Sequence, residues 1–134
     1  MSFLNYIKIF LLSLVSFLLL DGLWLLVVAK NFYKKYLGFI MGPVNWVPVM
    51  IFYPLYIIGL VFLVIVPAIE SGSWVRLLFG AALFGLCAYG AYDLTNQATI
   101  KDWPWIVTIV DILWGMIGAV IVSSVTFFII NKFF

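Results

Sequence analysis

Four long apolar stretches dominate the chain, and short polar connections separate them. They cover about residues 9–29, 46–66, 74–95 and 105–130. About 20 consecutive apolar residues are enough for a helix to cross the hydrocarbon core of a bilayer. The pattern therefore predicts an all-α membrane protein with four transmembrane helices. No composition shift divides the chain, so we expect residues 1–134 to form a single transmembrane domain.

The connections are short enough to join neighbouring antiparallel helices, which predicts an up-down bundle. The first connection, residues 30–43, is rich in lysine and aromatic side chains, which suit the membrane–water interface. A turn at residues 70–73 follows the second span. In the last connection, Asp102 is expected to cap the fourth helix, with Pro104 in an early helical position.

The second apolar stretch contains prolines at two internal positions, and a third closes it. Pro48 falls in the first helical turn, where its missing N–H is harmless. Pro54 lies inside the helix and removes one backbone hydrogen bond, so it predicts a kink. The carbonyl freed near Met50 must then face protein or water, because lipid offers no donor. We expect Pro67 to end this helix.

Composition agrees with a membrane protein and excludes most other classes. Hydrophobic residues make up 67% of the 134 positions and charged residues 9%, too few charges to cover a water-soluble surface. The net charge of +2, without a basic run, excludes a nucleic-acid partner. The chain has no histidine, which rules out histidine-ligated metals and histidine-activated nucleophiles, and no cofactor is indicated. Cys87 has no second cysteine to pair with.

With four spans, both termini share a side with the turn at residues 70–73. The other side carries four lysines, and we call it the Lys-rich end: Lys30, Lys34, Lys35 and Lys101. Three basic residues lie on the terminus side: Lys8, Arg76 and Lys132. Three against four leans only slightly toward cytoplasmic Lys-rich loops, so the orientation stays open.

Three aspartates interrupt the apolar spans and are the most informative residues. Asp21 precedes Lys30 by nine residues, which places it about 13 Å below the Lys-rich surface. Asp93 lies near the end of the third span, and Asp111 lies about 9 Å into the fourth. All three therefore occupy the same half of the membrane, where a lipid-facing carboxyl group costs several kcal/mol. Burial and mutual repulsion both favour the protonated form of a carboxyl group.

Polar and aromatic side chains lie within a helical turn or so of these aspartates. Trp24 follows Asp21 by three positions, as Trp114 follows Asp111. We expect a polar pocket that opens toward the Lys-rich end and binds a proton, a cation or a polar headgroup. The alternative is that the aspartates only hydrogen-bond across helices and hold the bundle together. The candidate binding residues are Asp21, Asp93, Asp111, Asn96, Tyr89, Thr95, Trp24, Trp114 and Tyr53.

The stretch AYGAYDLTNQATIKDWPWIVTIVDILWG, together with DGLWL in the first span, resembles a family of small bacterial inner-membrane proteins catalogued as a domain of unknown function. The resemblance covers nearly the whole chain. It implies a multi-pass protein of the bacterial inner membrane with four spans, and no established activity or cofactor. The signature positions that it implies are Asp93, Thr95, Asn96, Asp111, Trp114 and Gly115.

Three functions fit these observations. The first is a small binding or transport protein that uses the aspartates for a proton, a cation or an amphipathic solute, working as a homo-oligomer. The second is a structural or accessory subunit of a larger membrane complex. Small residues four apart, such as Ala81 and Gly85, favour it because they let helices approach closely. The third is a lipid-modifying enzyme that uses carboxylates as acid, base or Mg²⁺ ligands. However, the chain has no Gly-rich phosphate loop.

Overall fold

The computed structural model describes residues 1–134 and is helical throughout, as the sequence predicts. Two helical segments, η1 and η2, are π-helical turns with a wider backbone than the α-helices that they continue. In chain order the elements are α1 (Phe3–Leu23), η1 (Trp24–Val28), α2 (Lys30–Leu37), α3 (Trp46–Leu60), η2 (Val61–Ile65), α4 (Val66–Ser71), α5 (Trp74–Thr99) and α6 (Trp105–Phe133).

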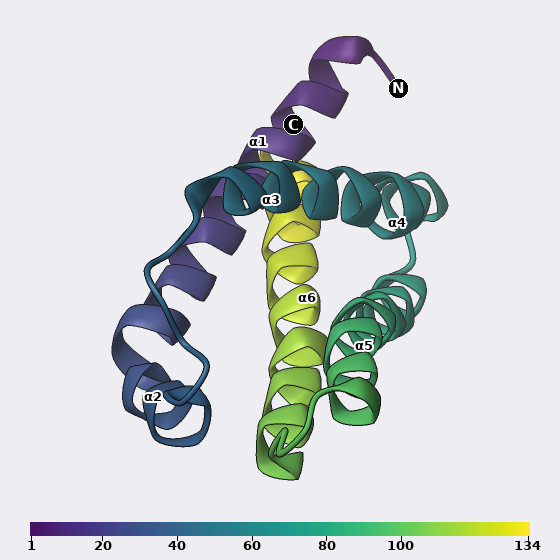
Figure 1. The fold of residues 1–134 in the computed structure, drawn as a ribbon. Coiled ribbons are helices and arrows are strands. Elements are labelled where there is room, and N and C mark those ends of the chain that lie inside the picture. Colours follow the sequence, from purple (N-terminus) through teal and green to yellow (C-terminus); the bar gives the residue numbers. More distant parts are fainter.

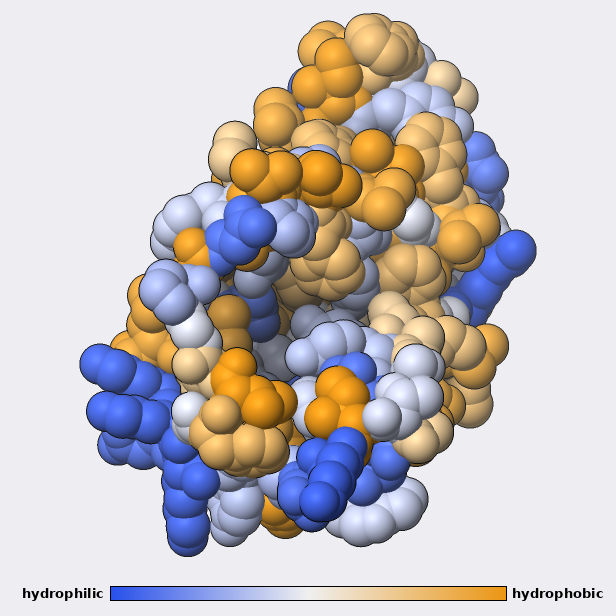
Figure 2. All heavy atoms as spheres, in the orientation of Figure 1, coloured by the Kyte–Doolittle hydropathy of each residue, from blue (hydrophilic) through white to orange (hydrophobic).

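Four continuous helical rods are long and apolar enough to cross a bilayer: Phe3–Val28, Trp46–Ser71, Trp74–Thr99 and Trp105–Phe133. Large apolar side chains cover the outside of the rods, and Phe79, for example, is 77% exposed. Figure 2 shows hydrophobic residues over most of the upper face. A surface of this kind would be unusual in water and is the one expected in lipid. The four membrane spans predicted from the sequence are thereby confirmed.

Neighbouring rods run antiparallel. Along the contact between α1 and α6, Ser13 meets Thr126 and Trp24 meets Trp114, so one number rises as the other falls. Figure 1 places both chain ends at one end of the molecule, and α2 with the α5–α6 turn at the other. The second rod, α3 through α4, crosses in front of α1 and α6 in this view.

Helices α5 and α6 approach each other most closely at two glycines. A Cβ added to Gly85 would lie 2.2 Å from the Gly115 carbonyl oxygen, and one added to Gly115 would lie 2.3 Å from the Tyr89 ring. No other residue fits at either position without moving a backbone or a ring. The small side chains of α5 and α6 therefore serve packing within the chain at this point.

The second rod continues past Pro67, where the sequence predicts its end, and stops at Ser71. In an α-helix the Pro67 ring would clash with the carbonyl four residues earlier. The π-helical turn η2 comes directly before it and widens the backbone, which lets the rod continue. The rod ends at Gly72, whose φ of 62° is a left-handed conformation that glycine adopts at no steric cost.

The connection after the first span contains the helix α2, which the hydrophobic pattern does not reveal. The chain turns at the buried Ala29, and α2 then lies against the bundle at the Lys-rich end. Its Leu37 packs with Trp103 and Val107 of the α5–α6 turn and α6. Its lysines are exposed. At eight residues, α2 is too short to produce a recognisable helical repeat of apolar residues in the sequence. A helix of this length is not stable alone, so it depends on the contact at Leu37.

The expected cap of the fourth span is wrong in detail. Asp102 makes no capping bond and adopts a left-handed turn with φ of 63°. Aspartate tolerates this conformation better than most residues. Pro104 is the residue before the first helical turn, rather than a member of it.

Candidate functional site

Asp21 of α1 is buried and accepts two hydrogen bonds from neutral donors. One comes from the Tyr53 hydroxyl of α3. The other comes from the indole Nε1 of Trp114 on α6, at 3.2 Å. The carboxyl group therefore joins three helices. Tyr53 reaches it because α1 and α3 pack side by side here, with the Tyr53 and Phe17 rings 5.4 Å apart.

Asp111 of α6 is also buried and accepts a hydrogen bond from the Tyr33 hydroxyl of α2. The same hydroxyl accepts a bond from Trp24 Nε1 at 3.1 Å. Tyr33 thus connects α2 and the end of the first span to an acid inside the fourth. The polar edge of α2 forms part of this site, and its lysines stay on the outer side.

The two tryptophans stack on each other, with ring centroids 4.4 Å apart and planes within 4° of parallel. Each tryptophan is hydrogen-bonded, directly or through Tyr33, to the aspartate of the other helix. Trp114 donates to Asp21, while Trp24 reaches Asp111 through Tyr33. The sequence spacing suggests that each tryptophan lies beside the aspartate three residues before it, but the stacked pair exchanges these partners across α1 and α6.

Asp93 of α5 differs from the other two aspartates. Its side chain is completely buried, and no donor reaches either carboxyl oxygen. The Asp111 carboxyl group of α6 is its acidic neighbour. Two ionised carboxylates have only acceptors, so a bond between them requires a proton on one. A cation between the two carboxylates would also stabilise them, and both could then remain ionised.

Asp21, Asp93 and Asp111 thus lie in one half of the bundle, and we call them the aspartate cluster. Asp111 is the central member, since both Asp21 and Asp93 are its acidic neighbours. No group of three acidic or thiol side chains converges closely enough to hold a metal ion. The donors that reach the cluster are phenol and indole groups, all without charge.

Tyr33 is the one titratable member of this network outside the spans, and its pKa is raised well above the usual value for tyrosine. Burial is the larger cause, and the hydrogen bond to Asp111 is the second. The phenol therefore stays protonated and remains a donor to Asp111 throughout the physiological range.

A second set of hydrogen bonds fastens the α5–α6 turn, and it reaches the aspartates only at the Asp93 backbone carbonyl, 3.5 Å from Thr108 Oγ1. Thr108 donates to Gln97 Oε1 at 2.8 Å and accepts from Trp103 Nε1 at 3.1 Å. Gln97 Nε2 in turn donates to the Trp103 carbonyl at 2.8 Å. Thr108 makes no hydrogen bond to Asp111, although it lies three residues before it. This arrangement fixes where α6 starts relative to the end of α5.

Two further candidate residues lie outside these bonds. Thr95 is exposed on α5, and only its backbone carbonyl is engaged, by Thr99. Asn96 is half-buried one turn after Asp93 and makes no bond to any of the aspartates. The structure therefore brings together Asp21, Asp93, Asp111, Trp24, Trp114 and Tyr53 from the predicted set, and leaves Thr95 and Asn96 aside.

Tyr89 lines a cavity rather than contacting Asp93 directly. The cavity has a volume of about 340 Å³ between α3 and α5, and its walls are Phe52, Ala88, Tyr89 and Tyr92. Figure 2 shows that the surface is hollowed between α2, α3 and α5. Tyr89 lies within electrostatic range of Asp21, and Tyr92 within range of Asp93 and Asp111. Tyr89 and Tyr92 thus belong both to the wall of the cavity and to the surroundings of the aspartate cluster.

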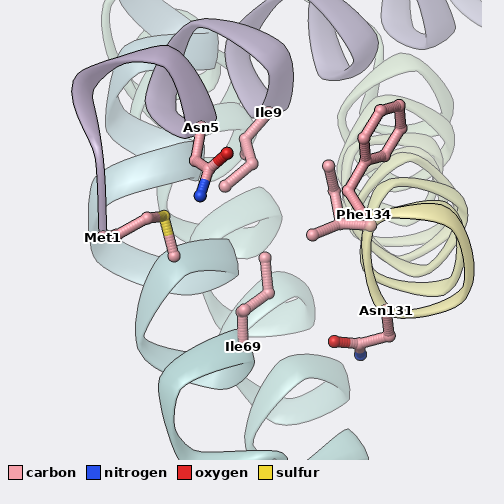
Figure 3. Close-up of a pocket in the computed structure, with 7 residues that line it drawn as sticks. Met1, Asn5, Ile9, Ile69, Asn131 and Phe134 are labelled. Atoms are coloured by element: carbon pink, nitrogen blue, oxygen red, sulfur yellow. The ribbon is translucent and has the colours of Figure 1, made fainter.

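A second cavity lies at the terminus end, between α1, α4 and α6. It has a volume of about 240 Å³, and Figure 3 shows the amides of Asn5 and Asn131 beside the apolar side chains of Ile9 and Ile69. It is far along the bundle from the aspartates, since Asn5 precedes Asp21 by sixteen helical residues, about 24 Å.

Tyr33 and Trp103 belong to these networks but are not singled out by the sequence. Tyr33 reads as one of several interfacial aromatics, because nothing in its spacing shows that α2 folds back under the bundle. The residues of α2 do have an amphipathic pattern. Apolar and aromatic residues lie on one side of this short helix and its lysines lie on the other, the first group being Phe32, Tyr33, Tyr36 and Leu37.

Comparison with known proteins gives one match. Residues 6–128 match the family described as "Predicted membrane protein (DUF2177)", a family of unknown function. No curated protein and no solved structure matches the chain. The match covers most of the chain, including the three aspartates, the second and third spans in full and most of the first and fourth. The protein therefore belongs to the DUF2177 family of predicted membrane proteins.

Proposed function

We propose that the protein is a small binding or transport protein of the bacterial inner membrane, and that its aspartate cluster exchanges a proton for an amphipathic organic cation. The observation that carries this proposal is Asp93. An ionised carboxylate without a partner is very costly to bury, so the group must be neutralised or paired. A proton bound to Asp93 or Asp111 would neutralise the buried charge in one state, and a cation bound beside them would do so in the other.

The aromatic cavity supports an organic cation as the second occupant. Two of its wall residues, Phe52 and Tyr92, are exposed at the surface, and its rings offer faces that attract a cationic group. Tyr89 and Tyr92 line this cavity, and both lie within electrostatic range of the aspartates, so a cation in the cavity would be attracted toward the carboxyl groups. A hydrophobic cation in the membrane would meet the cavity first and the carboxylates next.

The other two functions have less support. A lipid-modifying enzyme that relies on a metal needs converging carboxylates, and no three acids converge. An accessory subunit needs an outward face of small residues. Gly85 is buried against α6, whereas Cys87 and Ala91 lie on an exposed side of α5. Cys87 and Ala91 are therefore the small residues that remain free to contact a second copy or a larger membrane protein, and they are the only support for an accessory subunit.

The experiment is calorimetric titration of the protein in lipid nanodiscs with benzyltrimethylammonium. Repeating it in buffers with different heats of ionisation counts the protons released on binding. We expect binding with proton release in the wild type, and loss of the release in Asp93→Asn. Asp102→Asn changes an exposed acid of the α5–α6 turn and should leave both unchanged. No binding, or equal binding to Asp93→Asn without proton release from either protein, would overturn the proposal.

A further inference from the structure

Every fourth residue of α1 from Asn5 to Asp21 alternates between polar and apolar, and all of them except the exposed Asn5 are buried. Asn5 lines the terminus-end cavity, Ile9 forms its inner wall, and Ser13, Phe17 and Asp21 follow at the same spacing. Residues four apart lie on one face of a helix, about 6 Å from each other along the axis. Polar side chains therefore recur along one inner face of α1 from the terminus-end cavity to the aspartate cluster, with a single apolar residue between each.

The facing helix supplies matching hydroxyl groups in the middle of this face. Ser13 Oγ and Thr126 Oγ1 are 3.0 Å apart and completely buried. Ser123, one turn from Thr126 toward the aspartates, is also completely buried, and its hydroxyl has no partner. We call these three the hydroxyl group cluster. Burying a hydroxyl group without a hydrogen-bond partner costs free energy. A water molecule or a hydronium ion beside Ser123 would supply the missing hydrogen bond.

Phe17 separates the hydroxyl group cluster from Asp21. It is 2% exposed, and the ring of Tyr56 stacks on it with centroids 4.7 Å apart. The Tyr56 hydroxyl is buried and has no hydrogen-bond partner. Ser13 and Asp21 are about 12 Å apart along the helix, which is too far for a direct transfer. A shift of the Phe17 side chain would open this gap to water and to the Tyr56 hydroxyl.

We propose that this face of α1 is a route for protons between the aspartate cluster and the terminus-end cavity, closed at Phe17 in the present conformation. The inference rests on the proposed function and extends it, because it gives the protons of the aspartates a second exit. Each hydroxyl group or water in the route accepts one proton and releases another, so no group changes its net composition. The co-reactant is water that enters when Phe17 moves.

The test is proton flux into liposomes that contain the purified protein, driven by a potassium gradient with valinomycin and followed by an internal pH-sensitive dye. We expect the wild type to exceed empty liposomes. The double change Ser13→Ala with Thr126→Val should return the flux to that of empty liposomes. Ser124→Ala alters the half-buried neighbour of Ser123, which makes no side-chain bond, and should leave the flux unchanged.

Phe17 gives the opposite effect. Phe17→Ala should raise the flux above the wild type, and Phe17→Leu, which retains more volume and endangers the fold less, should raise it by a smaller amount. Phe79→Ala changes a lipid-facing phenylalanine and should have no effect. Flux equal to empty liposomes in both the wild type and the Phe17 variants would overturn the route, as would flux insensitive to the serine and threonine changes. Calorimetric proton release could survive either result, so the two proposals fail separately.

Discussion

The two halves of the bundle are held together by different means. Toward the terminus end, completely buried apolar side chains such as Ile57, Leu60 and Ile65 form most of the core, and the hydroxyl group cluster of α1 and α6 is the polar exception. Toward the Lys-rich end, carboxyl, phenol and indole groups from four helical elements replace that core. A bilayer requires no buried acids for stability, because apolar packing serves as well. The difference shows that the acids of the polar half are not needed for packing, which is the ground for proposing an occupant there.

The apolar half should be the more sensitive to loss of volume. Leu60 is completely buried in that core, so Leu60→Ala should lower the free energy of unfolding by about 3 kcal/mol. Thermal unfolding in nanodiscs measures the change. Leu63→Ala, three residues on and 71% exposed, is the matched control and should change little. Equal effects at the two positions would show that this half is not a packed core.

The boundary between the halves depends on close contact of α5 and α6. Gly85→Val should destabilise the protein by about 2 kcal/mol, because the new side chain meets the Gly115 backbone. Gly22→Ala meets nothing within 4 Å and removes a flexible residue from α1, so it should raise stability by about 0.5 kcal/mol. The same unfolding measurement compares them. A neutral Gly85→Val would contradict the observed approach of the two helices.

The polar half should tolerate the loss of Asp93 in stability but not in function. Asp93 makes no bond to a donor, so Asp93→Leu should change the free energy of unfolding by less than about 1 kcal/mol or increase it. Cation-linked proton release should disappear. A strong loss of stability in Asp93→Leu would instead favour the interpretation that the aspartates only hold the helices together.

The smallest effect concerns α2 and appears at high pH. When α2 lies against the bundle (the docked state), the pKa of Tyr33 is higher than when α2 is released from it. The docked state therefore binds the phenolic proton more tightly. Docking is then fully stable below about pH 10 and weakens as pH rises past it, because only the undocked phenol ionises there. Intrinsic amide exchange is base-catalysed and rises with pH in any protein, so the protection factors of the α2 amides are compared, and they should fall above that pH in the wild type. Tyr33→Phe should remove this dependence on pH.

Hydrophobic runs and their lengths were enough to predict the spans and the half of the membrane in which the aspartates lie. Contacts that depend on helix rotation were not predictable. The exchange of partners between Trp24 and Trp114 requires the π-helical turn and the stacking of two rings, neither of which leaves a pattern in the sequence. The role of Tyr33 depends on α2 folding back, which a tertiary contact at Leu37 determines.

Infrared spectroscopy of the protein in nanodiscs tests the central claim most directly, because it detects protonated carboxyl groups individually. At neutral pH we predict a protonated carboxyl band that disappears in Asp93→Asn or Asp111→Asn, persists in Asp102→Asn, and is lost when benzyltrimethylammonium binds. A band that the cation leaves unchanged, or the absence of any protonated carboxyl in the wild type, would contradict the account of the aspartate cluster as a site that exchanges a proton for a cation.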